Sequence, residues 1–276
     1  MTNAPAGATK ERIKFENPPI TELVVSLFHI PIPELKAQHI GIYWDRVREK
    51  YPLCQQQSIV VNPLDPQPQQ AFMQAPDEIF PLPRFWLLSN DHPTVIQVQR
   101  NAFMLNWRRL PSAMPSEYPH YENVVAEFWK ELTGYQKFLQ DTVGGKLDPI
   151  QRCELTYFNS ITPNEVFANQ GQLMNVLPPV ASFYDIQTDD RQFAGLNATA
   201  NYRVNPNLVT DLSIRFGRRA DTMEPALALE LKAHGVPNDL SLDGARVWYD
   251  SAHDATYKLF LDATAKQMQE AIWKPR

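Results

Sequence analysis

Residues 20–32 read ITELVVSLFHIPI, and residues 153–161 read CELTYFNSI. Both segments are rich in β-branched and aromatic residues and have prolines near their ends, so we expect each to form a β-strand. Each is introduced by a Pro-Ile pair, and a Glu-Leu pair recurs in them at 22–23 and 154–155. The second segment therefore indicates that the structural plan begun by the first one starts again.

The rest of the first half contains further recognisable elements. The spacing of apolar residues predicts a helix over 35–51, which ends at Tyr51-Pro52. A short strand is expected over 58–62, and the stretch 63–83, rich in proline and glutamine, is expected to be an extended and mobile connector. Two strands and a long helix complete this half, at 84–89, 94–107 and 124–139, with the helix ending near Gly144-Gly145.

The second half is expected to repeat this order. Residues 164–174 supply a short helix, and a closing helix runs over 242–272 with Asp243 as its cap. The strand candidates are residues 181–187, 193–204, 208–217 and 225–233. We therefore predict an α+β protein with two long helices packed on antiparallel sheets, built by tandem duplication of a βαβββα unit in a helix-grip or saddle-like form. Its predicted divisions are a flexible tail at 1–13 and units at 14–147 and 148–276, packed as one globular body.

Composition narrows the class of protein. A chain of 276 residues with 43% hydrophobic residues can bury a large core. The net charge of -5, with both signs interspersed, provides no basic field for nucleic acid. Cys54 and Cys153 stand far apart, which argues against a disulfide framework or a structural zinc. The polar start MTNAPAGATKE and the lack of a long apolar run predict a cytoplasmic protein with no membrane partner.

Motifs of the common chemistries do not occur in the sequence. The six histidines show no metal-ligand spacing, and no GxSxG, SxxK, GxGxxG or Walker pattern is found. We therefore expect no metal, no cofactor and no enzyme of a familiar type. Glu22 and Glu154 could form an acid-base pair across a pseudo-twofold axis. The alternative is that each lies on a solvent face or pairs with an arginine such as Arg84 or Arg152.

Polar side chains interrupt strands that are otherwise apolar. If they point inward, their amide and guanidinium groups need partners, which a polar ligand or an internal network would supply. Alternatively, they form the solvated face of an antiparallel strand. The candidate binding residues are Gln97, Gln99, Asn106, Arg108, Arg84, Glu22 and Glu154. Trp107 beside Arg108 and Arg109 would also permit RNA stacking, which the acidic total charge disfavours.

Several of these residues belong to a set of motifs. The sequence contains FENPPITE at 15–22, GIYW at 41–44 with Tyr51-Pro52, RFW at 84–86, QVQ at 97–99 with NWR at 106–108, and YFNSI at 157–161. In these motifs it resembles a sporadically distributed family of uncharacterised bacterial proteins. The resemblance implies no activity, cofactor or catalytic residue. The patchy occurrence of that family implies an accessory setting, such as a defence or toxin-antitoxin system.

Three functions remain open at this point. The first, which we favour, is a non-enzymatic protein that holds a small molecule or a protein partner in a groove between the sheet and the long helices, or on the sheet surface. The second is an enzyme of unfamiliar type, which requires ionisable groups that converge in a pocket. The third is an RNA-binding protein, which requires a basic stripe. A homo-oligomer is compatible with all three.

Overall fold

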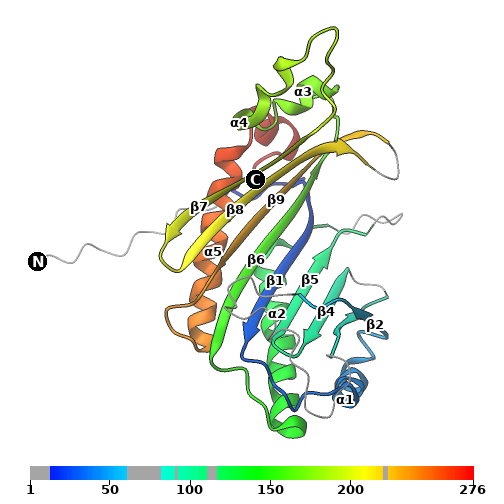
Figure 1. Cartoon of the computed structure of the whole chain (residues 1–276), viewed down its shortest axis with the longest axis vertical. Coiled ribbons are helices and arrows are strands. Elements are labelled where there is room, and N and C mark those ends of the chain that lie inside the picture. The colour runs from blue at the N-terminus through cyan, green and yellow to red at the C-terminus, as the bar shows by residue number, and fades with distance from the viewer. Residues whose placement is uncertain (1–12, 61–81, 91–92, 111–116, 220–222) are drawn as a thin grey trace, which may run out of the picture.

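The fold is seen in a computed structural model that describes residues 13–60, 82–90, 93–110, 117–219 and 223–276. Nine strands in these residues form one antiparallel sheet in the order β2-β3-β4-β5-β1-β6-β9-β8-β7 (Figure 1). The strands are β1 Ile20–His29, β2 Leu53–Gln57, β3 Arg84–Leu88, β4 Thr94–Gln99, β5 Ala102–Arg108, β6 Ile150–Ile161, β7 Leu196–Asn205, β8 Leu208–Arg218 and β9 Pro225–Gly235. The predicted tail and the predicted connector fall almost entirely outside the described residues.

The two segments that open the halves of the chain lie side by side at the centre of the sheet. β1 pairs with β6 in antiparallel register, and Val24 is opposite Thr156 in the middle of this pairing. On its other side β1 pairs with β5, and β6 pairs with β9. One sheet therefore runs through both halves, and the predicted α+β class with antiparallel strands is confirmed.

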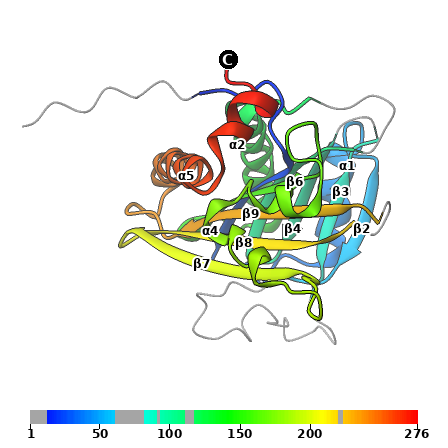
Figure 2. The same cartoon turned by 90° about the horizontal axis from the view of Figure 1, so that it is seen from above.

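Two long helices, α2 (His120–Phe138) and α5 (Leu242–Ala263), cover the same face of the sheet (Figure 2). We call this the helix face and the other side the opposite face. Within the described residues, every helix is too short or too polar to span a lipid bilayer. The smaller elements are α1 (Ala37–Val47), α3 (Gln170–Met174), α4 (Pro178–Ala181), a 3-10 turn (Tyr184–Ile186), α6 (Lys266–Met268) and π-helical turns at Leu139–Val143 and Gln269–Trp273.

The core fills the space between the helix face and the two long helices. Leu23 and Val25 of β1 are fully buried, and they belong to one apolar cluster with Phe128 of α2 and Tyr249 of α5. The hydroxyl of Tyr249 donates a hydrogen bond of 2.6 Å to the carbonyl of Ser26, which ties α5 to β1. Because successive strand residues point to opposite sides, the even-numbered residues of β1 point to the opposite face.

Some element boundaries in the first half differ from those predicted. Residues 94–107 form two strands, β4 and most of β5, joined by a turn at Arg100-Asn101. The edge strand β2 has no counterpart in the sequence-based expectations. The strand expected at 58–62 is absent over 58–60, and residues 61–62 lie outside the described part.

The second half also requires corrections. Residues 181–187, expected to be a strand, instead contain the last residue of α4 and the 3-10 turn at Tyr184–Ile186. The helix expected at 164–174 is restricted to α3, where the side chain of Asn169 accepts a hydrogen bond from the backbone of Gln172. The closing helix breaks after Ala263, and its cap is Ser241, whose hydroxyl accepts from the backbone of Gly244 at 3.2 Å. Asp243, the predicted cap, lies in the first turn.

Candidate functional site

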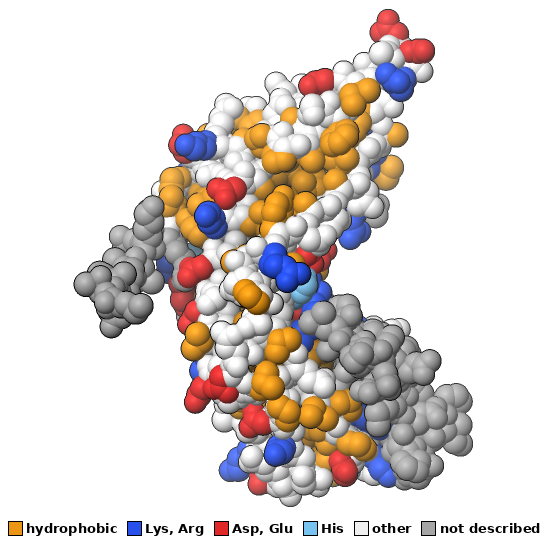
Figure 3. Space-filling model, turned by 60° about the vertical axis from the view of Figure 1, so that its left-hand side comes forward, with side chains coloured by type: hydrophobic (Ala, Val, Ile, Leu, Met, Phe, Trp, Pro, Cys, Tyr) orange, Lys and Arg blue, Asp and Glu red, His pale blue; other side chains and the backbone are white. Residues whose placement is uncertain are grey.

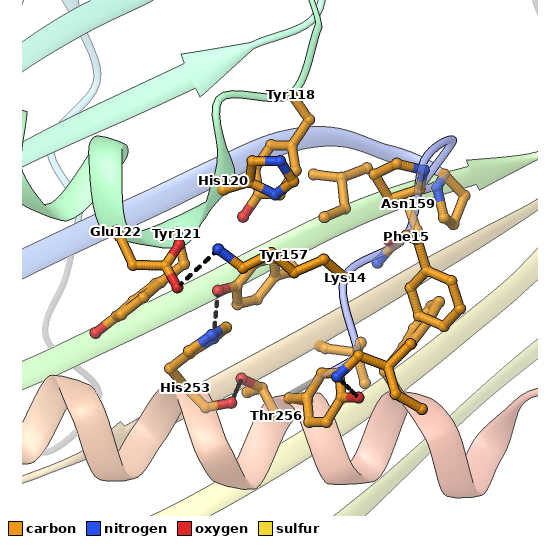
Figure 4. A pocket seen from close by; sticks show the side chains of 17 residues that line it. Lys14, Phe15, Tyr118, His120, Tyr121, Glu122, Tyr157, Asn159, His253 and Thr256 are labelled. Carbon is orange, nitrogen blue, oxygen red and sulfur yellow. Dashed lines mark hydrogen bonds and ion pairs between the residues drawn. The ribbon is translucent and has the colours of Figure 1, made fainter. Parts of the chain in front are cut away.

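A cavity of about 100 Å³ lies between the sheet and α5 (Figure 4). Its walls come from four parts of the chain: the segment before β1, the residues that open α2, the strands β1, β6 and β9, and α5. Phe15, Ile20 and Phe260 contribute apolar surface, whereas the polar groups come from residues 118–122, from β6 and from α5. An apolar wall with a few convergent polar groups is the usual composition of a ligand site.

Tyr157 and His253 join the sheet to α5 at this cavity. Tyr157 is an odd-numbered residue of β6, and like Leu155 it belongs to the buried cluster on the helix face. His253 lies on α5 next to Ala252, a member of the buried stripe of that helix. The Tyr157 hydroxyl lies 2.8 Å from Nδ1 of His253. Burial raises the pKa of Tyr157 well above its ordinary value, so its phenol stays protonated near neutral pH.

The residues that open α2 place two further rings at the cavity. The ring of Tyr121 stacks on that of His253, with centroids 3.8 Å apart and planes 9° from parallel. His120 has a backbone φ of 67°, a left-handed conformation that costs energy for a residue other than glycine. This conformation, at the first residue of α2, sets its imidazole beside the ring of Tyr118 at 5.5 Å (Figure 4).

Glu122 and Lys14 add opposite charges at the edge of the cavity. Nζ of Lys14 lies 3.7 Å from Oε1 of Glu122, and both side chains are about half exposed. Partial burial is the strongest influence on the Glu122 carboxyl and by itself would raise its pKa. A hydrogen bond from its own backbone N–H and the nearby Lys14, His253 and His120 outweigh burial and hold the pKa of Glu122 below its ordinary value. The edge therefore keeps a carboxylate and an ammonium group together.

Two other cavities are lined by different residues. One of about 420 Å³ lies between α2 and strands β4 and β5, beside Trp107 and Glu117. Its lining residues Pro93 and Glu117 adjoin parts of the chain that lie outside the described residues. Another of about 310 Å³ lies where the β7–β8 turn meets the start of α5. Neither combines stacked aromatic rings, two imidazoles and an ion pair, so we take the cavity of Tyr157 and His253 as the candidate site.

The structure brings four of the sequence-predicted site residues together on the opposite face. Arg84 Nη1 donates to Gln97 Oε1 at 2.6 Å, and Gln97 Nε2 donates to Asn106 Oδ1 at 2.5 Å. Asn106 Nδ2 in turn donates to Glu22 Oε1 at 2.5 Å. These amides and charges therefore form a continuous chain across β3, β4, β5 and β1, which is the internal network that the sequence left as one alternative.

Arg108 joins this group through an aromatic ring. Its guanidinium carbon lies 5.7 Å from the ring centroid of Trp86, and that of Arg84 lies 5.6 Å from the same centroid. The Trp86 indole N–H donates to Gln97 Oε1 at 3.0 Å. Burial raises the pKa of Glu22, while the bond from Asn106 and the charge of Arg108 act in the other direction.

Gln99 and Glu154 lie outside this network. Gln99 makes two hydrogen bonds of 2.9 Å with the backbone of Val60, so it orders the chain after β2. Glu154 is held by Arg152 at 2.6 Å and Lys232 at 2.9 Å. In the β1–β6 register Glu22 is opposite Phe158 and Glu154 is opposite Ser26, a stagger of four residues or about 13 Å. The suggested acid-base pair of Glu22 and Glu154 is therefore wrong. Glu154 instead pairs with an arginine, Arg152, as the alternative prediction stated.

Sequence reasoning missed the residues of the cavity itself. They come from segments far apart in the chain, so no local spacing announces them. The signal that could have indicated the cavity is YPHYE at 118–122, where two tyrosines, a histidine and a glutamate gather around the start of an amphipathic helix. Among the described residues no group of three or more His, Cys, Asp or Glu side chains could hold a metal ion.

No protein-family model matches the chain, and no curated protein matches it in sequence. The resemblance drawn from the motifs therefore stays a prediction, and the function has to be argued from the geometry.

Proposed function

We propose that this is a non-enzymatic binding protein that holds a small, mainly apolar ligand in the cavity between the sheet and α5. The observation that supports this most directly is the combination of an apolar wall, formed by Phe15 and Phe260, with the bonded pair Tyr157 and His253. An aromatic or aliphatic body would pack against the wall. A hydroxyl or carbonyl group would replace or extend the bond between the phenol and the imidazole.

The size of the cavity limits the ligand. An apolar cavity of about 150 Å³ accepts a benzene molecule, and the cavity here measures about 100 Å³. A single ring is therefore the upper limit for the group that enters, and such a ring would extend towards the edge of the cavity. The ion pair of Lys14 and Glu122 at the edge would meet the polar end of a longer ligand.

The face of the molecule drawn in Figure 3 does not favour the nucleic-acid alternative. In Figure 3, Lys and Arg side chains alternate with Asp and Glu side chains, and no basic stripe crosses the described part of this face. With a net charge of -5, the chain offers no sequence-independent attraction for phosphate backbones. The motif resemblance adds a proposed setting, an accessory defence or toxin-antitoxin system in the cytoplasm, in which a bound small molecule or a protein partner would be the signal.

We also infer that the two halves arose by duplication of one unit, within a saddle-like sheet. Val24 and Thr156, opposite each other at the sheet centre, are separated by the same number of positions as Glu22 and Glu154. In the sheet, reading outward from the centre, β1-β5-β4-β3 on one side corresponds to β6-β9-β8-β7 on the other. Along the chain, a long helix follows the last strand of each half, α2 after β5 and α5 after β9. A twofold axis through the central pair would place the candidate cavity close to where the two units meet.

Small aromatic probes test the proposed binding function. We expect phenol to bind saturably in ligand-observed NMR, and benzene to bind more weakly because it lacks the hydroxyl that reaches Tyr157 and His253. Thr256→Leu adds bulk at the buried cavity wall and should abolish binding. Thr199→Leu, an exposed change on β7, serves as the matched control and should leave binding intact. Absence of saturable binding by either probe, or equal binding by Thr256→Leu, would overturn the proposal.

A further inference from the structure

A second group of residues, on the opposite face, has the features of an anion site. Arg84 of β3 and Arg108 of β5 lie at nearly equal distances, 5.6 and 5.7 Å, from the Trp86 ring. Cation-π contact with one indole fixes where both guanidinium groups lie. Both arginines and Trp86 are half-buried, so the group is accessible from solvent and also partly shielded from it.

Both guanidinium groups retain unused hydrogen-bond donors. Nε of Arg84 and Nε of Arg108 are buried, and neither has a hydrogen-bond partner among the described residues. Arg84 uses Nη1 for Gln97, which orients its planar group without occupying Nε. Buried donors are nearly always paired in folded proteins, so two unpaired donors beside one ring indicate an acceptor that binds there.

The nearest carboxyl group does not fill this role. Glu22 is directly opposite Arg108 in the β1–β5 register, yet Nε of Arg108 donates no hydrogen bond to its carboxyl group. Oε1 of Glu22 accepts a hydrogen bond from Asn106. Burial raises the pKa of Glu22, while the hydrogen bond from Asn106 and the charge of Arg108 act in the other direction. Two positive groups thus remain beside one carboxyl that is committed to an amide.

We propose that Arg84 and Arg108 together bind an oxyanion, the carboxylate or phosphate group of a small molecule, on the opposite face of the sheet. The planar guanidinium offers two parallel N–H groups that match the oxygens of either anion. The site is separate from the cavity of Tyr157 and His253, because the sheet lies between them. The proposal of an anion site therefore does not depend on the function proposed for that cavity.

Anion titrations at constant ionic strength test this site. Inorganic phosphate and acetate are each titrated against a chloride background, and binding is followed by calorimetry and by the shift in melting temperature. The two probes distinguish a phosphate from a carboxylate ligand. We expect saturable binding of at least one of them to the unaltered protein, and at least tenfold weaker binding to Arg84→Gln and Arg108→Gln.

Matched variants separate this site from a general salt effect. Arg203→Gln removes an exposed arginine of β7 and should bind the anion as the unaltered protein does. Arg108→Lys keeps the charge without the planar fork, so it should fold and show an intermediate loss of affinity, which keeps the test valid if Arg108→Gln does not melt cooperatively. No saturable binding, an effect shared by chloride, or equal affinity in the Arg84, Arg108 and Arg203 variants would overturn the proposal.

Discussion

The hydroxyl of Tyr157 lies 2.8 Å from Nδ1 of His253, so a hydrogen bond joins the central strand β6 to the long helix α5 inside the cavity. The ring of Tyr121, from the start of α2, stacks on the same imidazole. His253 is therefore the point at which both long helices and the sheet meet. A change at this bond acts on the packing of the helices as well as on the cavity.

Tyr157→Phe should lower the free energy of unfolding by about 1 kcal/mol, the usual net contribution of one hydrogen bond. The ring and its packing stay, so the protein should remain folded with its helices in place. Urea denaturation measures the difference, and Tyr202→Phe on β7, where the tyrosine is exposed, provides the control. A loss equal to that of the Tyr202 variant would mean that the Tyr157 hydroxyl does not contribute to stability.

The two strand glutamates should respond differently to loss of their charge. Glu154→Gln leaves Arg152, which is 1% exposed, without its carboxylate partner. Breaking a buried pair in this way costs about 3 kcal/mol. Glu22→Gln should lower the free energy of unfolding by less than about 1 kcal/mol. The carbonyl oxygen of the glutamine can still accept the hydrogen bond that the Asn106 amide donates. Urea denaturation measures the stability of both variants. Equal losses of stability would contradict the finding that Glu154 belongs to a buried ion pair and Glu22 to an amide network.

The sequence was sufficient to predict the elements whose pattern is local. β1 and β6 are rich in β-branched and aromatic residues, and α2 carries a regular apolar stripe, so each element could be predicted from its own residues. The sequence also allowed an internal network of Arg84, Gln97 and Asn106 to be predicted as one alternative, because amides inside apolar strands need hydrogen-bond partners.

Other features depend on tertiary contacts that no local pattern records. The edge strand β2, read as LCQQQ, shows no apolar alternation, and its extended form comes from pairing with β3. The turn at Arg100-Asn101 contains neither glycine nor proline, so 94–107 reads as one strand. The cavity joins residues that are up to 247 positions apart, from Ile13 before β1 to Phe260 on α5.

Acid should destabilise the protein through His29. This residue is fully buried, and burial lowers its pKa from 6.5 to about 4, with a hydrogen bond to the Ile30 carbonyl acting the other way. The unfolded chain therefore binds a proton at higher pH than the folded chain does. Stability from this group is complete above pH 6.5 and is lost as the pH falls towards 4, by up to about 3 kcal/mol at 1.36 kcal/mol for each unit.

Urea denaturation at pH 7, 6 and 5 measures this loss. His29→Asn removes the titrating group but keeps a donor that can reach the same carbonyl, so its stability should fall less between pH 7 and 5. His234, whose pKa is also lowered mainly by burial, remains in the variant and accounts for part of the residual slope. The same pH dependence in both proteins would show that His29 does not carry the effect.

Alanine substitutions of the neighbours Trp107 and Arg108, which point to different faces of the sheet, should differ in their effect on stability. Trp107 is 4% exposed and packs in the core on the helix face, so Trp107→Ala should cost about 3–5 kcal/mol of stability. Arg108 points to the opposite face, where its guanidinium group lies over the Trp86 ring and its charge acts on the half-buried Glu22, so Arg108→Ala should cost about 1 kcal/mol or less. Thermal and urea unfolding of both variants gives the comparison. If Arg108→Ala unfolds the protein as strongly as Trp107→Ala, the arginine is a structural residue, and the opposite face loses its support as a binding surface.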